Sequence, residues 1–267
     1  MTEQHLAGGK IIQATDDAVG LVTFNNPVKH NAISLEMWEG LAQALASHRD
    51  DPAIHAVILT GAGEASFASG ADISQFDAQR HDAASSEAYS RRSAEARALL
   101  ATFPKPTIAA IRGFCLGGGL QVAMMADIRI AAETSRFGIP AARLGIAYGY
   151  DGLRTLVSLV GPAWARMLMF SGMRIDGPEA LRIGLVERLV AAEAVAGTAM
   201  ELARSIAENA PIAIRAAKVT IAEILKDPAD RDLALVGRLG AECMDSADFR
   251  EGRRAFMEKR RPLFSGS

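Results

Sequence analysis

The chain has 267 residues, of which 49% are hydrophobic and 22% are charged, and its formal net charge is −2. This composition is typical of a folded globular protein and excludes a disordered or collagen-like chain. The nearly neutral charge balance gives no electrostatic reason to expect binding to nucleic acid or to an anionic membrane surface. At about 150 residues per domain, the length fits one large domain with an appendage or two domains.

The cysteine content indicates a reducing compartment. The chain has two cysteines, Cys115 and Cys243, which are too few for a disulfide framework and too far apart for a CxxC pair or a zinc knuckle. A secretory leader begins with a basic segment followed by an apolar one, and this sequence does not begin in that way. The glycine-rich stretch 113–126 is too short to span a bilayer. We therefore expect a soluble, cytoplasmic protein without a membrane partner.

Strand and helix patterns alternate along the first two thirds of the chain. Short apolar runs predict strands at residues 19–24, 56–60, 107–111 and 127–132. After the first strand, Ser34 is suited to cap a helix. Apolar residues then recur at helical spacing: Leu35, Trp38, Leu41, Ala42 and Leu45. The polar stretch 79–102 also favours a helix, and the alternation indicates an α/β fold with parallel pairing.

From residue 191 onward no strand pattern remains. Pro211 suits a first helical turn, and an apolar stripe follows at helical spacing: Ile214, Ala217, Ile221, Ile224 and Leu225. We therefore divide the chain into an α/β core, residues 1–190, and a C-terminal helical region, residues 191–267. Because no long linker separates the two, we expect the helical region to pack directly on the core.

Common cofactor and metal motifs are incomplete in this sequence. The glycines Gly61 and Gly63 follow a strand but do not open a helix, as a dinucleotide-binding loop requires. Gly119 and Leu120 stand where a phosphate-binding loop needs Lys and Ser or Thr. The five histidines show no metal-binding spacing. We therefore predict no metal site.

Two glycine-containing loops, residues 67–73 and 113–121, each follow a predicted strand. In the second loop the glycines precede Leu120, where a buried helix is expected to start. The first N–H groups of a helix lack intrahelical acceptors and lie at the positive end of its dipole, so they can bind an anion or a developing oxyanion. The alternative is structural, since three glycines also allow a helix to pack closely on a sheet. The spacing alone does not separate these two interpretations.

Several segments of the chain, taken in order and including the two loops above, resemble the crotonase (enoyl-CoA hydratase/isomerase) superfamily. The matching segments are residues 26–32, 67–73, 117–119, 126–133, 137–140, 179–181 with 184–186, and 258–262. The resemblance covers nearly the whole chain. It implies a crotonase-like spiral of ββα turns followed by a C-terminal helical region, and assembly as a homotrimer or a dimer of trimers. It also implies an acyl-CoA substrate, with coenzyme A as part of the substrate and no separate cofactor.

The resemblance further implies site residues. Two backbone N–H groups that hold the thioester oxygen in the family correspond to Ala71 and Gly118. An enolate that forms at a thioester needs such donors, and the loss of one typically costs about 3 kcal/mol. Residues expected near the CoA and acyl groups are Lys29, His30, Ala32, Ala68, Gly70, Asp72, Ile73, Leu116, Gly117, Ala141 and Tyr148. The basic residues Lys259, Arg260 and Arg261 either assist the CoA phosphates or form a solvated end.

The departures from the family pattern concern its catalytic acids. Hydratases of this family use two glutamates, and Gln121 and Ala141 occupy those positions here. A glutamine can hydrogen-bond a water but cannot exchange a proton at neutral pH, and an alanine can do neither. The sequence therefore predicts a reaction other than standard hydration. The candidates are isomerisation, C–C cleavage or decarboxylation, and thioester hydrolysis.

Other groups are possible sources of an acid or a base. Asp151 is either a general acid/base or the cap of a helix that starts near Leu153. Tyr148 and Tyr150 either orient a substrate carbonyl or ring, or simply pack. Reserve candidates precede the third strand: Glu87, Tyr89, Arg91 and Glu95.

Three functional hypotheses follow from the sequence. The first is a crotonase-superfamily enzyme that stabilises an enolate with Ala71 and Gly118, with Gln121 and Asp151 as further catalytic candidates. The second is a homologue that binds acyl-CoA without turning it over. The third is a structural oligomer with a vestigial site.

Overall fold

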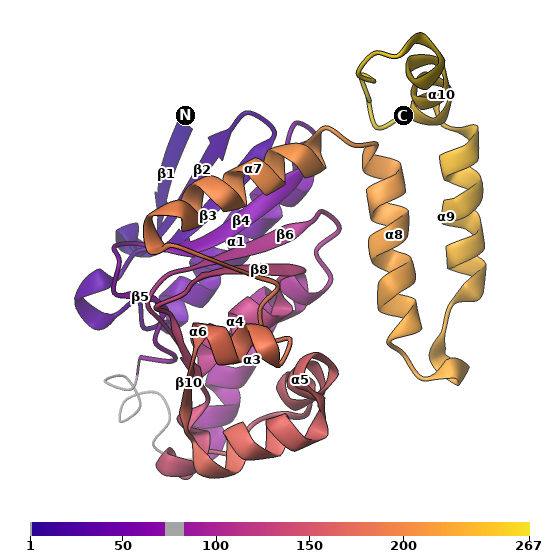
Figure 1. Ribbon diagram of the computed structural model, residues 1–267. Helices are drawn as coiled ribbons and strands as arrows, with labels where there is room; N and C mark the ends of the chain where they lie inside the picture. The colour runs from indigo at the N-terminus through magenta and orange to yellow at the C-terminus, as the bar shows by residue number, and fades with distance from the viewer. Residues whose placement is uncertain (1, 73–82) are drawn as a thin grey trace.

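The computed structural model describes residues 2–72 and 83–267. Its larger sheet has the strand order β1-β2-β3-β4-β6-β8-β11 (Figure 1). The strands are β1 (Thr2–Leu6), β2 (Ile11–Asp16), β3 (Val19–Phe24), β4 (Ala56–Gly61), β6 (Thr107–Ile111), β8 (Ile128–Ala132) and β11 (Arg188–Val190). From β3 to β11 all pairs are parallel, as predicted.

The N-terminal end of the larger sheet was not predicted. Strands β1, β2 and β3 pair in antiparallel fashion. The turn at Asp17 and Ala18 joins β2 to β3, and Asp17 adopts a φ of 51°. A connection this short can only join antiparallel strands, because a parallel pair needs a crossover of a dozen or more residues.

A second, smaller sheet follows the order β10-β9-β7-β5. Its strands have three residues each: β5 (Ser66–Ala68), β7 (Phe114–Leu116), β9 (Arg136–Gly138) and β10 (Arg174–Asp176). Successive turns of the chain run β4 to β5, β6 to β7 and β8 to β9, each time crossing from the larger sheet to the smaller one. The helices that follow are α3 (Ala83–Ala101), α4 (Gly118–Met125) and α5 (Tyr150–Ser171). The result is a spiral of ββα turns.

Local sequence signals account for helix α1 (Leu35–Asp50). The Ser34 side chain accepts a hydrogen bond from the Met37 N–H, which confirms the predicted cap. The face that carries Leu35, Trp38, Leu41 and Leu45 is buried in the main hydrophobic core. The apolar periodicity therefore identified both the helix and its buried face.

Two hydrophobic cores lie on opposite faces of the larger sheet. The main core joins α1, α3, α4 and α5 to both sheets. The second lies under α7 (Val195–Ala207), which crosses the outer face of the sheet (Figure 1). Val195, Ala199 and Ala203 of α7 are fully or almost fully buried there. Helix α7 thus packs on the sheet, and the domain boundary at residue 190 stays a prediction.

The last three helices stand beside this body (Figure 1). They are α8 (Pro211–Ile224), α9 (Leu233–Asp245) and α10 (Ala247–Glu258). Pro211 occupies the first turn of α8, as predicted. Within the described residues no strand follows β11. The remaining short helices are η1 (Ala7–Gly9), η2 (Pro27–Lys29), η4 (Pro140–Leu144), α6 (Gly177–Arg182), η5 (Ala192–Ala194) and η6 (Pro228–Asp230).

The structure corrects two expectations and confirms the described part of a third. The helix predicted near Leu153 begins at Tyr150 with Gly149 as its cap, so Asp151 lies inside its first turn and does not cap it. The predicted stripe on α8 is not packed on the core, since Ile221, Ile224 and Leu225 are 59–67% exposed. Helix α8 instead contacts the core through Lys218, which donates to the Asp127 carboxylate at 2.7 Å. The helix predicted at 79–102 spans 83–101, and its first predicted residues, 79–82, lie outside the described ones.

None of the helices in the described part of the chain combines the length and the apolar character needed to cross a membrane.

Candidate active site

The loop that follows β5 is held by hydrogen bonds to the segment before α1. The Ile33 N–H donates to the Gly70 carbonyl at 2.7 Å, and the Asp72 N–H donates to the Ile33 carbonyl at 3.1 Å. This parallel bridge pairs Ile33 with Ala71. In such a bridge the paired residue points its own N–H away from the partner strand. The Ala71 N–H therefore faces away from Ile33.

A buried asparagine, Asn31, fixes the segment that leads from β4 into β5. Its side chain donates to the carbonyls of Ala62 and Ser66, at 3.0 and 2.7 Å, and accepts from the Asn26 N–H at 2.9 Å. Asn31 is fully buried and adopts a φ of 54°, a conformation that asparagine tolerates better than most residues. The sequence analysis did not single out Asn31 as a positioning residue, although an Asn that follows a turn is a recognisable signal.

The second loop ends at the N-terminus of α4. Gly117 caps this helix with a φ of 50°, and its N–H donates to the Gly138 carbonyl at 2.9 Å. Gly118 is the first helical residue, so its N–H has no intrahelical acceptor. A Cβ on Gly119 would overlap the Ala68 carbonyl, which shows how closely α4 approaches β5. Gly119 therefore permits close packing of the helix on the sheet, as the structural interpretation expected. Gly118 lies at the helix terminus, and the binding of an oxyanion there stays a prediction.

The two loops bring the predicted pair of amides together. The Ala71 nitrogen lies 3.6 Å from the position that a Cβ on Gly118 would take, and the Gly118 nitrogen lies 3.6 Å from the Cβ position of Gly70. Within the described residues, neither N–H is used by another group of the protein. Glycine at position 70 is required by its φ of 117°. The arrangement can hold an oxyanion between two backbone donors.

Gln121 lies one helical turn beyond Gly118, on the same face of α4. Its side-chain Nε2 lies 3.0 Å from the position that a Cβ on Gly152 would take, and Cε1 of the Tyr148 ring lies 2.6 Å from that position. Gln121 and Tyr148 therefore meet over the backbone of Gly152. Ala141 is buried in η4. Its methyl group supplies no polar function.

The other acid/base candidates lie at the surface. Asp151 is exposed in the first turn of α5, and Tyr150 is 78% exposed. On α3, Glu87 is exposed and pairs with Arg91 at 3.4 Å, and Glu95 is exposed as well. The side chain of Tyr89 is outside what the structure describes.

The residues predicted near CoA form a second group around η2. Lys29 and the buried Asp72 form an ion pair at 2.9 Å. His30 packs edge-on against Phe114, with ring centroids 6.1 Å apart. Ala32, Ala68 and Leu116 are buried around the two loops. Ile73 lies outside the described residues.

The basic C-terminal residues are tied to acidic neighbours. Arg260 pairs with Glu251 and Glu258 at 2.6 Å, and Arg261 lies 3.7 Å from Glu208. The Arg260 guanidinium and the Leu263 N–H hold the pKa of the Glu251 carboxyl well below its usual range. These ion pairs favour the solvated-end interpretation over a role in phosphate binding.

Across residues 2–72 and 83–267, no cluster of three or more His, Cys, Asp or Glu side chains is placed to hold a metal ion.

A family model described as enoyl-CoA hydratase/isomerase matches residues 14–267. The chain belongs to the enoyl-CoA hydratase/isomerase family. It is 37% identical to a short-chain-enoyl-CoA hydratase from Clostridium acetobutylicum, over 94% of this chain and 95% of that protein. It is 33% identical to a crotonyl-CoA hydratase from Syntrophomonas wolfei, over 97% and 99% of the two chains.

Solved structures of family members share the fold. An enoyl-CoA hydratase/carnithine racemase from Magnetospirillum magneticum superposes with a TM-score of 0.92 at 36% identity, covering 97% of this chain and 96% of that one. An enoyl-CoA hydratase from Bacillus anthracis gives 0.90 at 32% identity, covering 97% and 100%. The predicted membership of the crotonase superfamily and the predicted fold are thereby confirmed.

Proposed function

We propose that this protein is an enzyme that acts on an acyl-CoA thioester and stabilises an enolate-like intermediate between the Ala71 and Gly118 N–H groups. The observation that carries this proposal is the close approach of the two amide nitrogens, each N–H being without another acceptor among the described residues. Donors placed where negative charge develops typically contribute more to catalysis than any other single feature. Coenzyme A enters as part of the substrate, and no other cofactor is required.

The proposed reaction differs from two-glutamate hydration. The resemblance to hydratases aligns Gln121 and Ala141 with the two catalytic glutamates, and neither side chain can donate or accept a proton at neutral pH. Isomerisation, C–C cleavage, decarboxylation and thioester hydrolysis remain open. Decarboxylation needs no protein base, because the loss of carbon dioxide leaves its electron pair on the carbon that the thioester stabilises.

A panel of thioesters tests this proposal. The protein is incubated with enoyl-, dienoyl-, malonyl-type and aroyl-CoA, and the products are followed by mass spectrometry. We expect turnover of at least one thioester and slow hydration of crotonyl-CoA. Hydration of crotonyl-CoA at the rate of a two-glutamate relative would contradict our interpretation of Gln121 and Ala141.

Removal of the Gly118 N–H donor tests whether the site is a working acyl-CoA site or a vestigial one. Gly118→Pro deletes the N–H at a first helical position, which tolerates proline. We expect weaker thioester binding and a loss of turnover of about 100-fold or more. The matched control is Leu233→Pro, at the first position of α9. Binding without turnover in the wild type would indicate a non-catalytic acyl-CoA binder, and no binding would indicate a structural protein.

Asp151 remains a candidate general acid/base in this proposal, although its side chain is exposed. The Asp151→Asn variant keeps the size of the side chain and removes its titration. Loss of turnover with retained thioester binding would support the role. Full activity would discard it.

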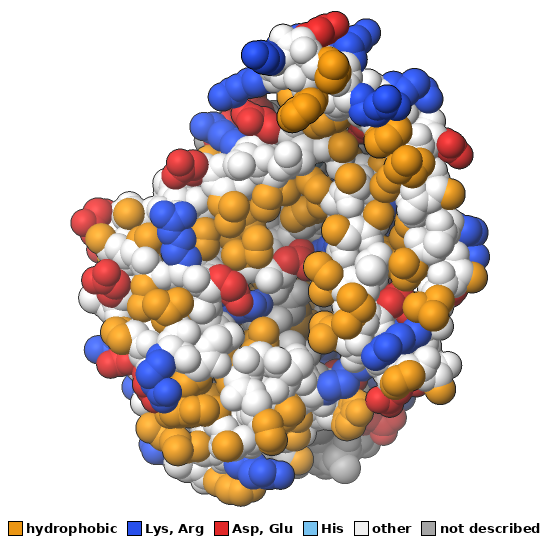
Figure 2. Space-filling model, turned by 45° about the vertical axis from the view of Figure 1, so that its right-hand side comes forward, with side chains coloured by type: hydrophobic (Ala, Val, Ile, Leu, Met, Phe, Trp, Pro, Cys, Tyr) orange, Lys and Arg blue, Asp and Glu red, His pale blue; other side chains and the backbone are white. Residues whose placement is uncertain are grey.

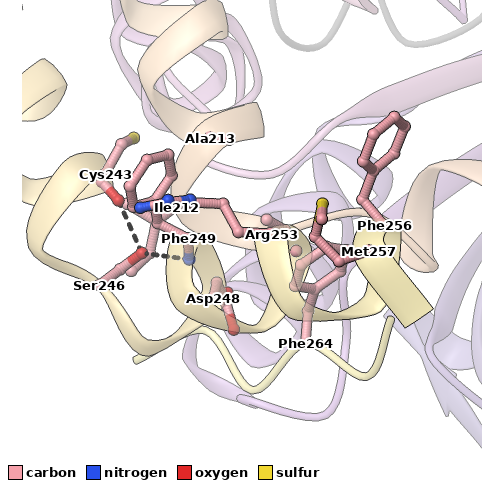
Figure 3. A pocket seen from close by; sticks show the side chains of 12 residues that line it. Ile212, Ala213, Cys243, Ser246, Asp248, Phe249, Arg253, Phe256, Met257 and Phe264 are labelled. Atoms are coloured by element: carbon pink, nitrogen blue, oxygen red, sulfur yellow. Dashed lines mark hydrogen bonds between the residues drawn. The ribbon is translucent and has the colours of Figure 1, made fainter. Parts of the chain in front are cut away.

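We further propose that the chain assembles with copies of itself, as a trimer or a dimer of trimers. Hydrophobic side chains gather over the C-terminal helices (Figure 2). Phe256 and Met257 of α10 are 82% and 80% exposed. They border a groove of roughly 540 Å³ (Figure 3). A large exposed apolar surface usually marks an interface. The residues that line this groove include none of the predicted site residues.

A further inference from the structure

The candidate active site holds a buried hydroxyl that the proposed chemistry does not use. Tyr148 lies just before α5, and its hydroxyl is buried without a hydrogen-bond partner among the described residues. Such an unsatisfied group is rare in folded proteins and calls for an explanation. Burial raises the pKa of this phenol, so the hydroxyl stays protonated at neutral pH and is able to donate.

The surroundings of this hydroxyl are rich in donors. The Tyr148 ring and the Gln121 carboxamide meet over Gly152. Among the charged side chains that the structure describes, Arg97 of α3 is the one that acts electrostatically on the phenol, and its charge favours the ionised form. A phenol O–H and an amide N–H match an acceptor oxygen of a ligand.

The same group lies close to the oxyanion amides. Gln121 follows Gly118 by three residues on α4, so the two positions share a helical face about one turn apart. An acyl group whose thioester oxygen lies at the Gly118 N–H would therefore bring its next few atoms toward Gln121 and Tyr148. A second oxygen close to the thioester is the group that this position suits.

We propose that Tyr148 and Gln121 bind a second oxygen function of the acyl group, and that the substrates are acyl-CoA thioesters in which the carbon next to the α-carbon is itself the carbon of a ketone or of a carboxylate. This inference rests on the proposed function and specifies its substrate class. It also accounts for the glutamine at position 121, because a carboxylate there would repel an anionic substrate group. Tyr148 acts as a binding residue, and no proton transfer is assigned to it.

The test compares three thioesters of similar length: butyryl-CoA, acetoacetyl-CoA and malonyl-CoA. Binding to the wild-type protein is measured by calorimetry at low temperature, and mass spectrometry checks that each ligand stays intact. A ligand that is consumed is compared by kcat/KM instead. We expect at least one of the two oxygenated thioesters to bind about 10-fold or more tightly than butyryl-CoA. Tighter binding of acetoacetyl-CoA would identify the second oxygen function as a ketone, and tighter binding of malonyl-CoA would identify it as a carboxylate.

Tyr148→Phe removes only the hydroxyl. We expect this variant to lose the preference for the oxygenated thioester and to bind butyryl-CoA as the wild type does. Its thermal stability should not fall, because the deleted hydroxyl has no partner among the described residues. Tyr150→Phe is the matched control, since Tyr150 belongs to the same segment and is 78% exposed. That variant should keep the preference.

The outcomes separate this inference from the proposed function. If the wild type shows no preference, or if Tyr148→Phe keeps it, the inference is wrong and acyl-CoA binding stands. If the wild type binds none of the three thioesters, both the inference and the proposed function are wrong.

Discussion

Two substitutions at single residues separate the proposed chemistry from hydration. Gln121→Glu is nearly isosteric and places a carboxylate one turn from Gly118, and Ala141→Glu supplies the second acid that the resemblance to hydratases implies. We expect the double variant to hydrate crotonyl-CoA about 100-fold or more faster than the wild type, because general acid–base catalysis contributes on that scale. The initial rate of absorbance loss of crotonyl-CoA measures it.

The single variants serve as controls for the double one. Gln121→Glu alone lacks the second acid, and Ala141→Glu alone keeps a glutamine that cannot exchange protons. Each should gain less than the double variant does. Equal rates in the wild type and in the double variant would show that hydration does not depend on these two positions.

The sequence located single residues well where one segment decides their position. The helix expected to start at Leu120 is present and begins two residues earlier, at Gly118, because the glycine run and the apolar segment after it lie together in the chain. The sequence could not predict that Tyr148 and Gln121 both approach Gly152, since this depends on how α5 begins relative to α4. Helix α5 likewise begins at Tyr150 and not near Leu153. Helix boundaries are the part of an element that local sequence defines least sharply.

At the scale of elements, the approach of α4 to β5 controls the oxyanion pair. A Cβ on Gly119 would overlap the Ala68 backbone, which cannot move without displacing β5. We expect Gly119→Ala to lower the free energy of unfolding by about 1–3 kcal/mol and to reduce turnover, because Gly118 moves with the helix. Thermal unfolding and thioester turnover are measured together.

Gly197→Ala is the control for Gly119→Ala. Gly197 lies in α7 with open space around it. An alanine there should stabilise the helix slightly, since alanine has the higher helix propensity. Comparable losses in both variants would mean that the close approach of α4 to β5 is not the cause.

The packing of α1 on β3 predicts a dependence of stability on pH. His48 of α1 is buried against Gly20, and burial lowers its pKa below the ordinary 6.5. Below pH 6.5 the unfolded chain therefore binds a proton that the folded chain does not, and stability falls as the pH decreases. Above pH 6.5 both states are neutral at this group, and its contribution is constant.

Thermal unfolding between pH 7.5 and 5.5 checks this dependence. His48→Gln should have a smaller decrease of Tm across that range than the wild type, whatever its Tm at pH 7.5. His5→Gln is the control, because His5 is exposed and pairs with Glu3 at the surface. An unchanged pH slope in His48→Gln would rule out His48 as the source.

The strands of the smaller sheet, all of which the sequence missed, share one property. Strands β5, β7, β9 and β10 have three residues each, too few for apolar alternation to identify them. Their partners lie far away in the chain, so pairing rather than local preference makes them strands. The longer β3, β4 and β6 are buried in the middle of the sheet, and their apolar runs identified them.

At the scale of the whole molecule, the apolar pattern of the C-terminal helices does not decide which surface covers them. The stripe on α8 has the periodicity of a buried face, yet Ile221 and Ile224 are 59% and 60% exposed. The periodicity therefore reports that a face is apolar, and not what covers it. A second copy of the chain is the occupant that we propose.

The Ile221→Glu/Ile224→Glu double variant tests the proposed assembly. Two carboxylates on an apolar interface lose hydration without gaining partners, which disfavours association. We expect the wild type to have the mass of a trimer or a hexamer by light scattering after gel filtration, and the variant to have a lower mass at the same concentration. Ala53→Glu, at an exposed position after α1, should assemble as the wild type does. A monomeric wild type, or a variant of unchanged mass, would contradict an interface on this face, and the stripe on α8 would then need a different partner.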